Sequence, residues 1–345
     1  MLYVTTRNNR ETYPISRVLT ENRSPDGGFY IPASMPEFSK SEILSLGKKP
    51  YNACVAETLN LFFDSNLSGY DLDFSIGRSS ARLISLPHRI WIGESWHNLE
   101  GDFRRTELAL YRKISGNPDG LPADWFRIAL RIGVLFGYFG KLMRRNAVSW
   151  DCPMDLAVFS GDFTLPMAAY YARTMGLPIA NIILCCNDNN NPWELLHHGQ
   201  MRTNISVITT DTPEGDYAIP TDMERFVQAC GGSKEVTRYV SCVEEGRMYI
   251  PGDWVLEKMR TGVHASVVGA DRVYSAVPNV YSTHGQLLDA YTALGYSGLM
   301  DYRAVAGESR HALVLSERGP GSDPRFFREA MGISQQEADA LLQQI

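Results

Sequence analysis

Four side chains that can bind a metal or move a proton lie within nine residues of one another: Glu94, His97, Glu100 and Asp102. If this segment forms a helical turn, His97 and Glu100 share one face at spacing i, i+3. A histidine and a carboxylate on one face are typical of a metal site, and a divalent ion, zinc first, would polarise a carbonyl and acidify its α-proton. Without a metal, His97 would be a general base oriented by Glu100. The structural alternative is a capped helix start with a surface histidine.

A second candidate site lies in the segment 155–186, where a short apolar run ends in Ser160-Gly161, an amphipathic run ends at Gly176, and a further apolar run follows. This pattern predicts strand, glycine turn, helix and strand, the βαβ unit of a parallel sheet. Such a turn directs backbone N–H groups toward an anion. Asp162 stands at this point, either as a cap of the helix or as the group that binds the ammonium of an amino-acid substrate, with Ser160 beside it.

Three further residues are candidates for substrate binding. Asn187 and Asp188 follow a predicted strand, and open α/β sheets bind ligands at the C-terminal ends of their strands. Their alternative role is turn formation, for which Asn and Asp are well suited. His284 precedes the periodic run 287–294, so we expect it at a helix start, either structural or facing the same cleft.

The composition is that of an ordinary globular protein: 345 residues, 44% hydrophobic and 21% charged. A net charge of -6 argues against nucleic acid as a partner, because phosphate binding needs a basic surface. The longest apolar runs are shorter than the ~20 residues of a membrane span, and residues 1–10 are too polar for a signal peptide. Six cysteines without paired short spacings predict reduced thiols. We therefore expect a cytoplasmic protein.

The predicted elements divide the chain into a helical and hairpin cap over 1–80 and an α/β main domain over 81–345. In the main domain the strands are expected within 83–93, 155–159, 179–186, 205–210 and 310–315, and the helices at 102–113, 124–143, 164–175, 221–230, 254–262, 284–294 and 323–343. Strands alternate with helices from residue 155 onward, which predicts a parallel, doubly wound sheet.

The turn and helix after residue 160 resemble the threonine synthase family, whose loop for pyridoxal phosphate (PLP) reads Ser-Gly-Asn-Phe-Gly before a helix that ends in Gly-Leu-Pro. Here the loop is Ser160-Gly-Asp-Phe-Thr164 and the helix ends in Gly176-Leu-Pro178. Other patches are similar to the same family: Tyr3–Arg7, Ser24–Pro32, Met35–Ser39, Ser282–His284, His311–Leu315 and Pro324–Phe327. The resemblance implies a threonine-synthase-like fold (fold type II, as in tryptophan synthase β) and a lyase-type enzyme of amino-acid metabolism.

The chain departs from this family where the cofactor would be bound. The family's Phe-Lys-Asp supplies the Schiff-base lysine, and alignment on Asp102-Phe103 puts Gly101 in its place. No lysine lies between Lys49 and Lys113. The family's second glycine-rich loop has no counterpart, so the small lobe that covers the cofactor is expected to be reduced or lost. We therefore expect no PLP, with the His97 segment at the position of the missing lysine.

These expectations favour a PLP-independent enzyme of specialised (secondary) metabolism. It would remove the α-proton of an amino acid or of a carrier-tethered aminoacyl derivative. Elimination, substitution or ring closure at the β or γ carbon would follow. A thioester would acidify that proton, and Arg104, Arg105 and Arg112 would dock an acidic carrier protein. A homodimer is also expected. Two alternatives are a non-catalytic scaffold of a biosynthetic complex and a PLP-dependent lyase that uses Lys113 or Lys141.

Overall fold

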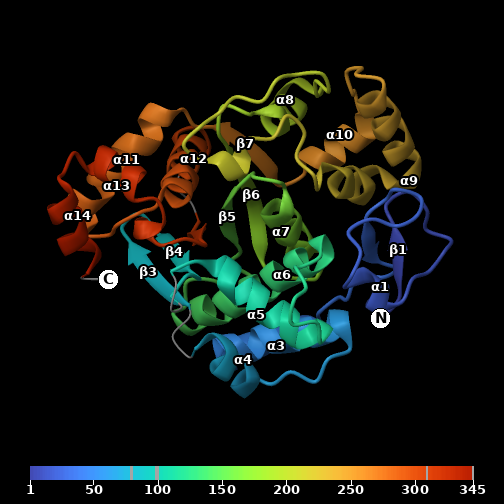
Figure 1. The fold of residues 1–345 in the computed structure, drawn as a ribbon, viewed down its shortest axis with the longest axis horizontal. Helices are drawn as coiled ribbons and strands as arrows, with labels where there is room; N and C mark the ends of the chain where they lie inside the picture. Colours follow the sequence, from blue (N-terminus) through green and yellow to red (C-terminus); the bar gives the residue numbers. More distant parts are fainter. Residues whose placement is uncertain (78–80, 98–100, 308–309, 344–345) are drawn as a thin grey trace.

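A six-stranded sheet forms the centre of the molecule (Figure 1). The structure is a computed structural model that describes residues 1–77, 81–97, 101–307 and 310–343. In spatial order the strands are β3 (Arg82–Leu86), β4 (Ile90–Glu94), β8 (Ala312–Ser316), β5 (Met154–Phe159), β6 (Ile179–Cys186) and β7 (Val263–Val267). All neighbouring pairs are parallel except β3 and β4. The strands from residue 155 onward are thus parallel, as expected, whereas β3 and β4 form an antiparallel hairpin, because their three-residue connection is too short for a crossover.

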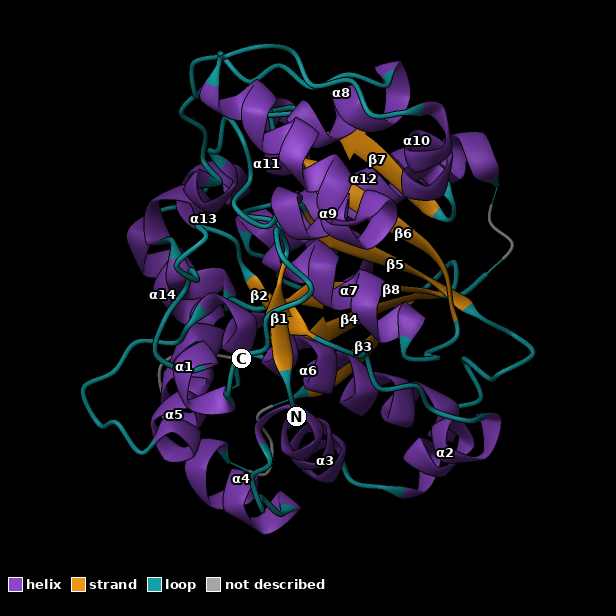
Figure 2. Cartoon of the chain, turned by 90° about the vertical axis from the view of Figure 1, so that its right-hand side faces the viewer, coloured by secondary structure: helices purple, strands orange, loops and turns teal. Residues whose placement is uncertain are grey.

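Alternate residues of the parallel strands pack into two separate cores. On β5, Leu156 and Val158 belong to the larger core and Ala157 to the smaller one. The larger core is closed mainly by α3 (Tyr51–Phe63), α6 (Asp124–Arg144), α7 (Thr164–Thr174) and α9 (Met223–Glu244). The smaller core is closed by α11 (Ala270–His284), α12 (Ala290–Ala306), α13 (Pro324–Met331) and α14 (Gln335–Leu342). Helices thus cover both faces of the sheet, as Figure 2 shows, and the α/β prediction is confirmed.

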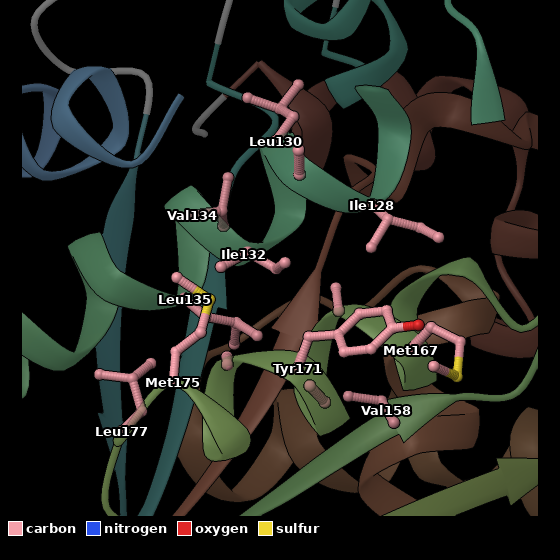
Figure 3. Close-up of a cluster of buried hydrophobic side chains, with 14 of the residues drawn as sticks. Ile128, Leu130, Ile132, Val134, Leu135, Val158, Met167, Tyr171, Met175 and Leu177 are labelled. Atoms are coloured by element: carbon pink, nitrogen blue, oxygen red, sulfur yellow. The ribbon is translucent and has the colours of Figure 1, made fainter. Parts of the chain in front are cut away.

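Helix α6 is the main support of the larger core. Figure 3 shows Ile128 and Ile132 of α6 in the same buried cluster as Met167 and Tyr171 of α7. On another side, α6 contacts α3 and the turn before α3, and this close contact depends on glycine residues of α6. A Cβ at Gly137 would lie 2.5 Å from Tyr51 Cδ2, and one at Gly140 would lie 2.7 Å from the carbonyl oxygen of Leu46. These glycines let the two segments approach α6 closely.

The N-terminal segment contains a two-stranded antiparallel sheet that packs against the rest of the chain. Its strands are β1 (Tyr3–Thr5) and β2 (Tyr30–Pro32). Thr6 Oγ1 donates to Glu224 Oε1 of α9 at 2.5 Å, and Arg7 Nη2 to Glu224 Oε2 at 3.0 Å. The remaining helices are α1 (Ile15–Val18), α2 (Lys40–Ser45), α4 (Gly69–Ile76), α5 (Phe103–Ser115), α8 (Asn191–His198) and α10 (Asp253–Arg260). The division at residue 80 stays a prediction.

Two predicted elements are wrong. The segment 205–210 is a loop, because Ile208 exchanges its backbone hydrogen bonds with the Asn189 side chain and β7 takes the place beside β6. The helix expected over 284–294 is instead the end of α11 and the start of α12. Gly285 ends α11 with a φ of 68°, and Asp289 caps α12 through the N–H of Tyr291. Among the described helices, none is both long and apolar enough to span a membrane.

Candidate functional site

A cleft of about 390 Å³ opens over the turn that connects β5 to α7. It lies where β5 and β8 end, the edge at which open α/β sheets bind ligands. Most of its lining is charged or polar, and the residues are Arg104, Glu107, Pro122, Asp124, Arg127, Arg131, Phe159, Ser160, Gly161, Asp162, Thr164, Leu165, Glu214, Tyr217 and Glu317. The predicted substrate-binding residues Ser160 and Asp162 therefore both lie in the cleft, together with Arg104 of the predicted docking surface, whereas Arg127 and Arg131 were not predicted.

Asp162 is held at the start of α7 by two donors. Its Oδ1 accepts the Thr164 N–H at 3.0 Å, and its Oδ2 accepts Arg127 Nη1 at 2.7 Å. The residue between, Phe163, has a φ of 74°, which turns the backbone so that the carboxylate can reach the helix end. Burial alone would raise the pKa of Asp162, but Arg127 and the Thr164 N–H outweigh it and lower the pKa. Asp162 thus caps the helix as an ionised carboxylate.

Arg127 belongs to a chain of ion pairs that runs along the cleft. Its Nε lies 3.4 Å from Glu107 Oε1, and Glu107 Oε2 accepts Arg131 Nη1 at 2.5 Å. Arg131 Nη2 in turn donates to Glu317 Oε2 at 2.8 Å. The other oxygen of Glu317, Oε1, is buried and has no hydrogen-bond partner among the described residues. Burial raises the pKa of Glu317 despite the attraction of Arg131.

Asp124, the first residue of α6, is a second carboxyl group with a raised pKa. Its backbone N–H donates to Asn22, but no hydrogen bond from another described residue reaches its carboxyl group. Burial raises the pKa of Asp124 more than the nearby Arg225 and Arg127 lower it. The cleft therefore holds one carboxylate whose pKa is lowered, Asp162, and two carboxyl groups whose pKa is raised.

The predicted His97 site lies only in part within the described residues. Residues 95–97 form a loop after the end of β4, and the predicted turn from His97 to Glu100 extends beyond the described residues. His97 Nε2 lies 2.6 Å from Glu94 Oε2, and its ring stacks on Trp96 with centroids 3.9 Å apart. Glu100 lies outside the described residues. Among the described residues, the carboxylate beside His97 is Glu94, three residues before it.

Glu94 and Asp102 lie in different surroundings. Glu94 lines a second cavity, of about 250 Å³, and neither it nor His97 lines the cleft. Asp102 caps α5 by accepting the Arg104 N–H at 2.8 Å, and its Oδ2 accepts Arg104 Nη2 at 2.8 Å. Burial raises the pKa of Asp102, but Arg104 outweighs it and lowers the pKa. Asp102 is not a lining residue of the cleft, but it contacts Arg104, which is.

The remaining predicted residues do not line the cleft. The Asn187 amide donates to Thr212 and Asp216, which fixes the 210–216 loop. Asn187 and Asp188 line a separate cavity of about 20 Å³, too small for an amino acid. His284 is the last residue of α11, so its predicted position at a helix start is wrong.

Comparison with known proteins finds similarity to the threonine synthases. Residues 2–80 match the family model for the threonine synthase N terminus. The chain is 28% identical over 219 residues to threonine synthase from Methylobacillus glycogenes, which covers 61% of this chain and 44% of that protein. It is 22% identical over 198 residues to human threonine synthase-like 1, covering 56% of this chain and 26% of that protein. The chain thus spans less than half the length of these curated relatives.

The solved structures agree with the sequence matches. Yeast threonine synthase superposes with a TM-score of 0.83 at 15% identity, and PLP-bound threonine synthase from Brucella melitensis with 0.81 at 18%. Each match covers 99% of this chain and 94% of the solved chain. In sequence and in fold, the chain is similar to the threonine synthases. The predicted threonine-synthase-like fold is confirmed.

In its described lining, the cleft has guanidinium groups but no amine. No lysine lines it among the described residues, so the amine for a Schiff base is missing there. The two alternatives for an unrecognised lysine are both engaged elsewhere: Lys113 Nζ lies 3.0 Å from Asp71 Oδ1, and Lys141 Nζ donates to the Ala81 carbonyl at 2.5 Å. In addition, Asp162 presents a negative charge at the helix start where a phosphate would bind.

A metal site in this threonine synthase relative finds no support in the described residues. Among them, no group of three or more His, Cys, Asp or Glu side chains could hold a metal ion. Of the predicted zinc pair, only His97 lies in the described part of the chain, and its close partner is the Glu94 carboxylate.

Proposed function

We propose that this chain is an enzyme that acts without PLP on an amino acid or an aminoacyl derivative bound in the cleft. The supporting observation is that one cleft, built on the loop that resembles the PLP loop of threonine synthases, combines guanidinium groups with carboxyl groups and has no lysine in its described lining. Guanidinium groups bind carboxylates and carbonyl oxygens, and carboxylates bind ammonium groups. A zwitterionic or amide-like substrate could therefore bind to the guanidinium groups and to the carboxylates at the same time.

The chemistry proposed is removal of the α-proton, followed by elimination, substitution or ring closure at the β or γ carbon. Asp124 and Glu317 would carry the proton, because a carboxyl group with a raised pKa is a stronger base than an ordinary one when it ionises. Asp162 would stay ionised and bind the ammonium group. Arg127 and Arg104 would stabilise the negative charge that develops on the substrate carbonyl oxygen.

A thioester substrate suits a cleft without PLP, since a thioester acidifies the α-proton and so replaces part of the cofactor's effect. We propose an acidic carrier protein as the donor of this thioester, as in specialised metabolism. Arg105 and Arg112 are exposed on α5, the helix that also supplies Arg104 to the cleft. A carrier bound to α5 would thus deliver its substrate beside the carboxyl groups.

The test is α-deuterium exchange, measured by mass spectrometry, on N-acetylcysteamine thioesters of a set of amino acids in D₂O. We expect exchange with the wild-type protein and a roughly 10²–10⁴-fold loss in Asp124→Asn or Glu317→Gln. His97→Ala should retain exchange, because His97 does not line the cleft. Loss of exchange in His97→Ala alone would assign the base to the Glu94–His97 pair instead. A PLP aldimine in the purified protein that disappears on borohydride treatment would refute the PLP-independent proposal.

The second candidate function is a non-catalytic scaffold. It is favoured by one observation: most charged groups of the cleft are paired with one another, as in the chain from Asp162 through Arg127 and Glu107 to Arg131 and Glu317. A wild-type protein that exchanges no α-proton on any thioester would support this function over the enzyme.

A further inference from the structure

The second cavity is built from elements that the cleft does not use. It has a volume of about 250 Å³ and lies between the β3–β4 hairpin, the end of α11 and α14. Its lining residues are Arg82, Ile84, Glu94, Trp96, Tyr281, Gly285, Gln286, Leu287, Pro320 and Leu341, none of which lines the cleft. At slightly below the roughly 300 Å³ of the smallest common ligand pockets, it suits a single small molecule.

The polar centre of this cavity is the carboxylate of Glu94. Its side chain is only 5% exposed. Its Oε1 accepts the Gln286 amide at 2.8 Å, and its Oε2 lies 2.6 Å from His97 Nε2. Neither partner is a lysine or an arginine. His97 supplies a positive charge only when it is protonated, and a buried carboxylate is costly without one, so a cationic group of a ligand in the cavity would stabilise Glu94.

An anion-binding group stands across from Glu94. Arg82 of β3 pairs directly with Glu94 of β4 in the antiparallel register, so the two side chains leave the sheet on the same face. Both line the cavity. The cavity thus presents one acidic and one basic side chain to the same small ligand, which suits a zwitterion.

The rest of the lining is apolar or aromatic. Ile84, Leu287 and Leu341 offer aliphatic surface, while Trp96 and Tyr281 offer ring faces that attract cations. Trp96 is fixed by its Nε1–H, which donates to Ser316 Oγ at 3.1 Å.

We propose that this cavity binds a free α-amino acid with an apolar side chain. The ammonium group lies at Glu94, the carboxylate at Arg82, and the side chain against Ile84, Leu287 and Leu341. This site is separate from the cleft and does not depend on the function proposed for the cleft.

The test is isothermal titration calorimetry of the whole chain with three probes: L-leucine, 3-methylbutylamine, which lacks the carboxylate, and 3-methylbutanoate, which lacks the ammonium group. We expect saturable binding of L-leucine and at least about tenfold weaker binding of each other probe, because each loses one charged hydrogen-bonding group. Equal binding of the amine and L-leucine, or no binding of L-leucine up to 10 mM as a rough ceiling for a specific small-ligand site, would overturn the proposal.

Two variants at opposite ends of the cavity locate the site. Glu94→Gln and Arg82→Gln should each weaken L-leucine binding at least about tenfold. Arg82 is on an exposed edge strand, so its variant keeps the proposal testable if thermal unfolding shows that Glu94→Gln does not fold. Asp162→Asn is the matched control in the cleft and should leave the affinity unchanged. If Asp162→Asn abolishes binding and Glu94→Gln does not, L-leucine binds in the cleft, which overturns this site and leaves the function proposed for the cleft standing.

Discussion

Asp162 and Arg127 are joined at 2.7 Å, and the same carboxylate accepts the first free N–H of α7 at 3.0 Å. One side chain therefore completes a helix end and anchors the chain of ion pairs along the cleft. Asp124 lines the same cleft without such donors. The two carboxyl groups consequently have pKa values shifted in opposite directions, and this difference can be measured.

We expect Asp162→Asn and Asp124→Asn to change the pH dependence of stability with opposite signs. The folded pKa of Asp162 is lowered, so its stabilisation is present above the unfolded value of about 3.9 and is lost as the pH falls through the folded pKa. The folded pKa of Asp124 is raised, so its stabilisation is present below about 3.9 and is lost as the pH rises through the folded pKa.

The measurement is urea unfolding of both variants and the wild type at several pH values from about 3 to 7. Asp162→Asn should lose stability relative to the wild type as the pH rises, whereas Asp124→Asn should gain it. Each shift of one pKa unit corresponds to about 1.4 kcal/mol. Parallel curves for the two variants would contradict the assigned charges.

Asp222→Ala should be among the most destabilising single changes, at about 3–5 kcal/mol. Arg225 is fully buried, and Asp222 is the carboxylate paired with it. Among the described residues, removing that carboxylate leaves the buried guanidinium with the Tyr30 carbonyl and the face of the Phe29 ring, but without its hydrogen-bonded counter-ion. Asp151→Ala is the control, because its exposed pair with Lys40 should contribute less than about 1 kcal/mol. Similar unfolding free energies for both variants would refute this prediction.

Gly140→Ala should lower the free energy of unfolding by about 1–3 kcal/mol, because the new methyl group would overlap the Leu46 carbonyl oxygen at 2.7 Å. Helix propensity alone predicts the reverse, a gain of about 1 kcal/mol for Ala over Gly. The sign of the change in thermal or urea unfolding therefore decides between close packing and propensity at this position.

Arg127→Lys should weaken substrate binding in the cleft markedly while lowering the free energy of unfolding only slightly. A lysine cannot bridge Asp162 and Glu107 at once, because it lacks the forked guanidinium. If the α-exchange assay is active, we expect a KM increase of about tenfold or more with a change in unfolding free energy below about 1.5 kcal/mol. An unchanged KM would place the substrate away from Arg127.

The parts of the fold that could be predicted from the sequence are those with local signals. The unit from β5 to β6 has two apolar runs, a glycine turn and an amphipathic run within about thirty residues, and both strands, the turn and helix α7 are found where expected. The loop at 205–210 has the apolar residues of a strand, but its hydrogen bonds go to Asn189 and Asp216. Strand β7 was not predicted, because nothing in its own five residues shows that β6 is its neighbour.

The candidate site was predictable only in part, for the same reason. Ser160 and Asp162 were expected in a ligand cleft because the turn that carries them has a recognisable pattern. Arg127 and Arg131, at i+3 and i+7 from Asp124, form a charged face on an otherwise apolar helix, a signal that was available. Glu317 follows β8 directly, as Asn187 follows β6. Which of the two enters the cleft depends on where the neighbouring loops pack, and a single sequence does not contain that information.

The position of β8 has a consequence for how the protein is made. β8 follows all the other strands in the chain, yet it lies between β4 and β5 and is the connection between the two halves of the sheet. Until residue 316 has left the ribosome, β4 and β5 each present an open parallel edge, the kind of surface on which incomplete chains pair with one another. The insertion of β8 closes both edges at once, and in the same event it carries Glu317 into the cleft.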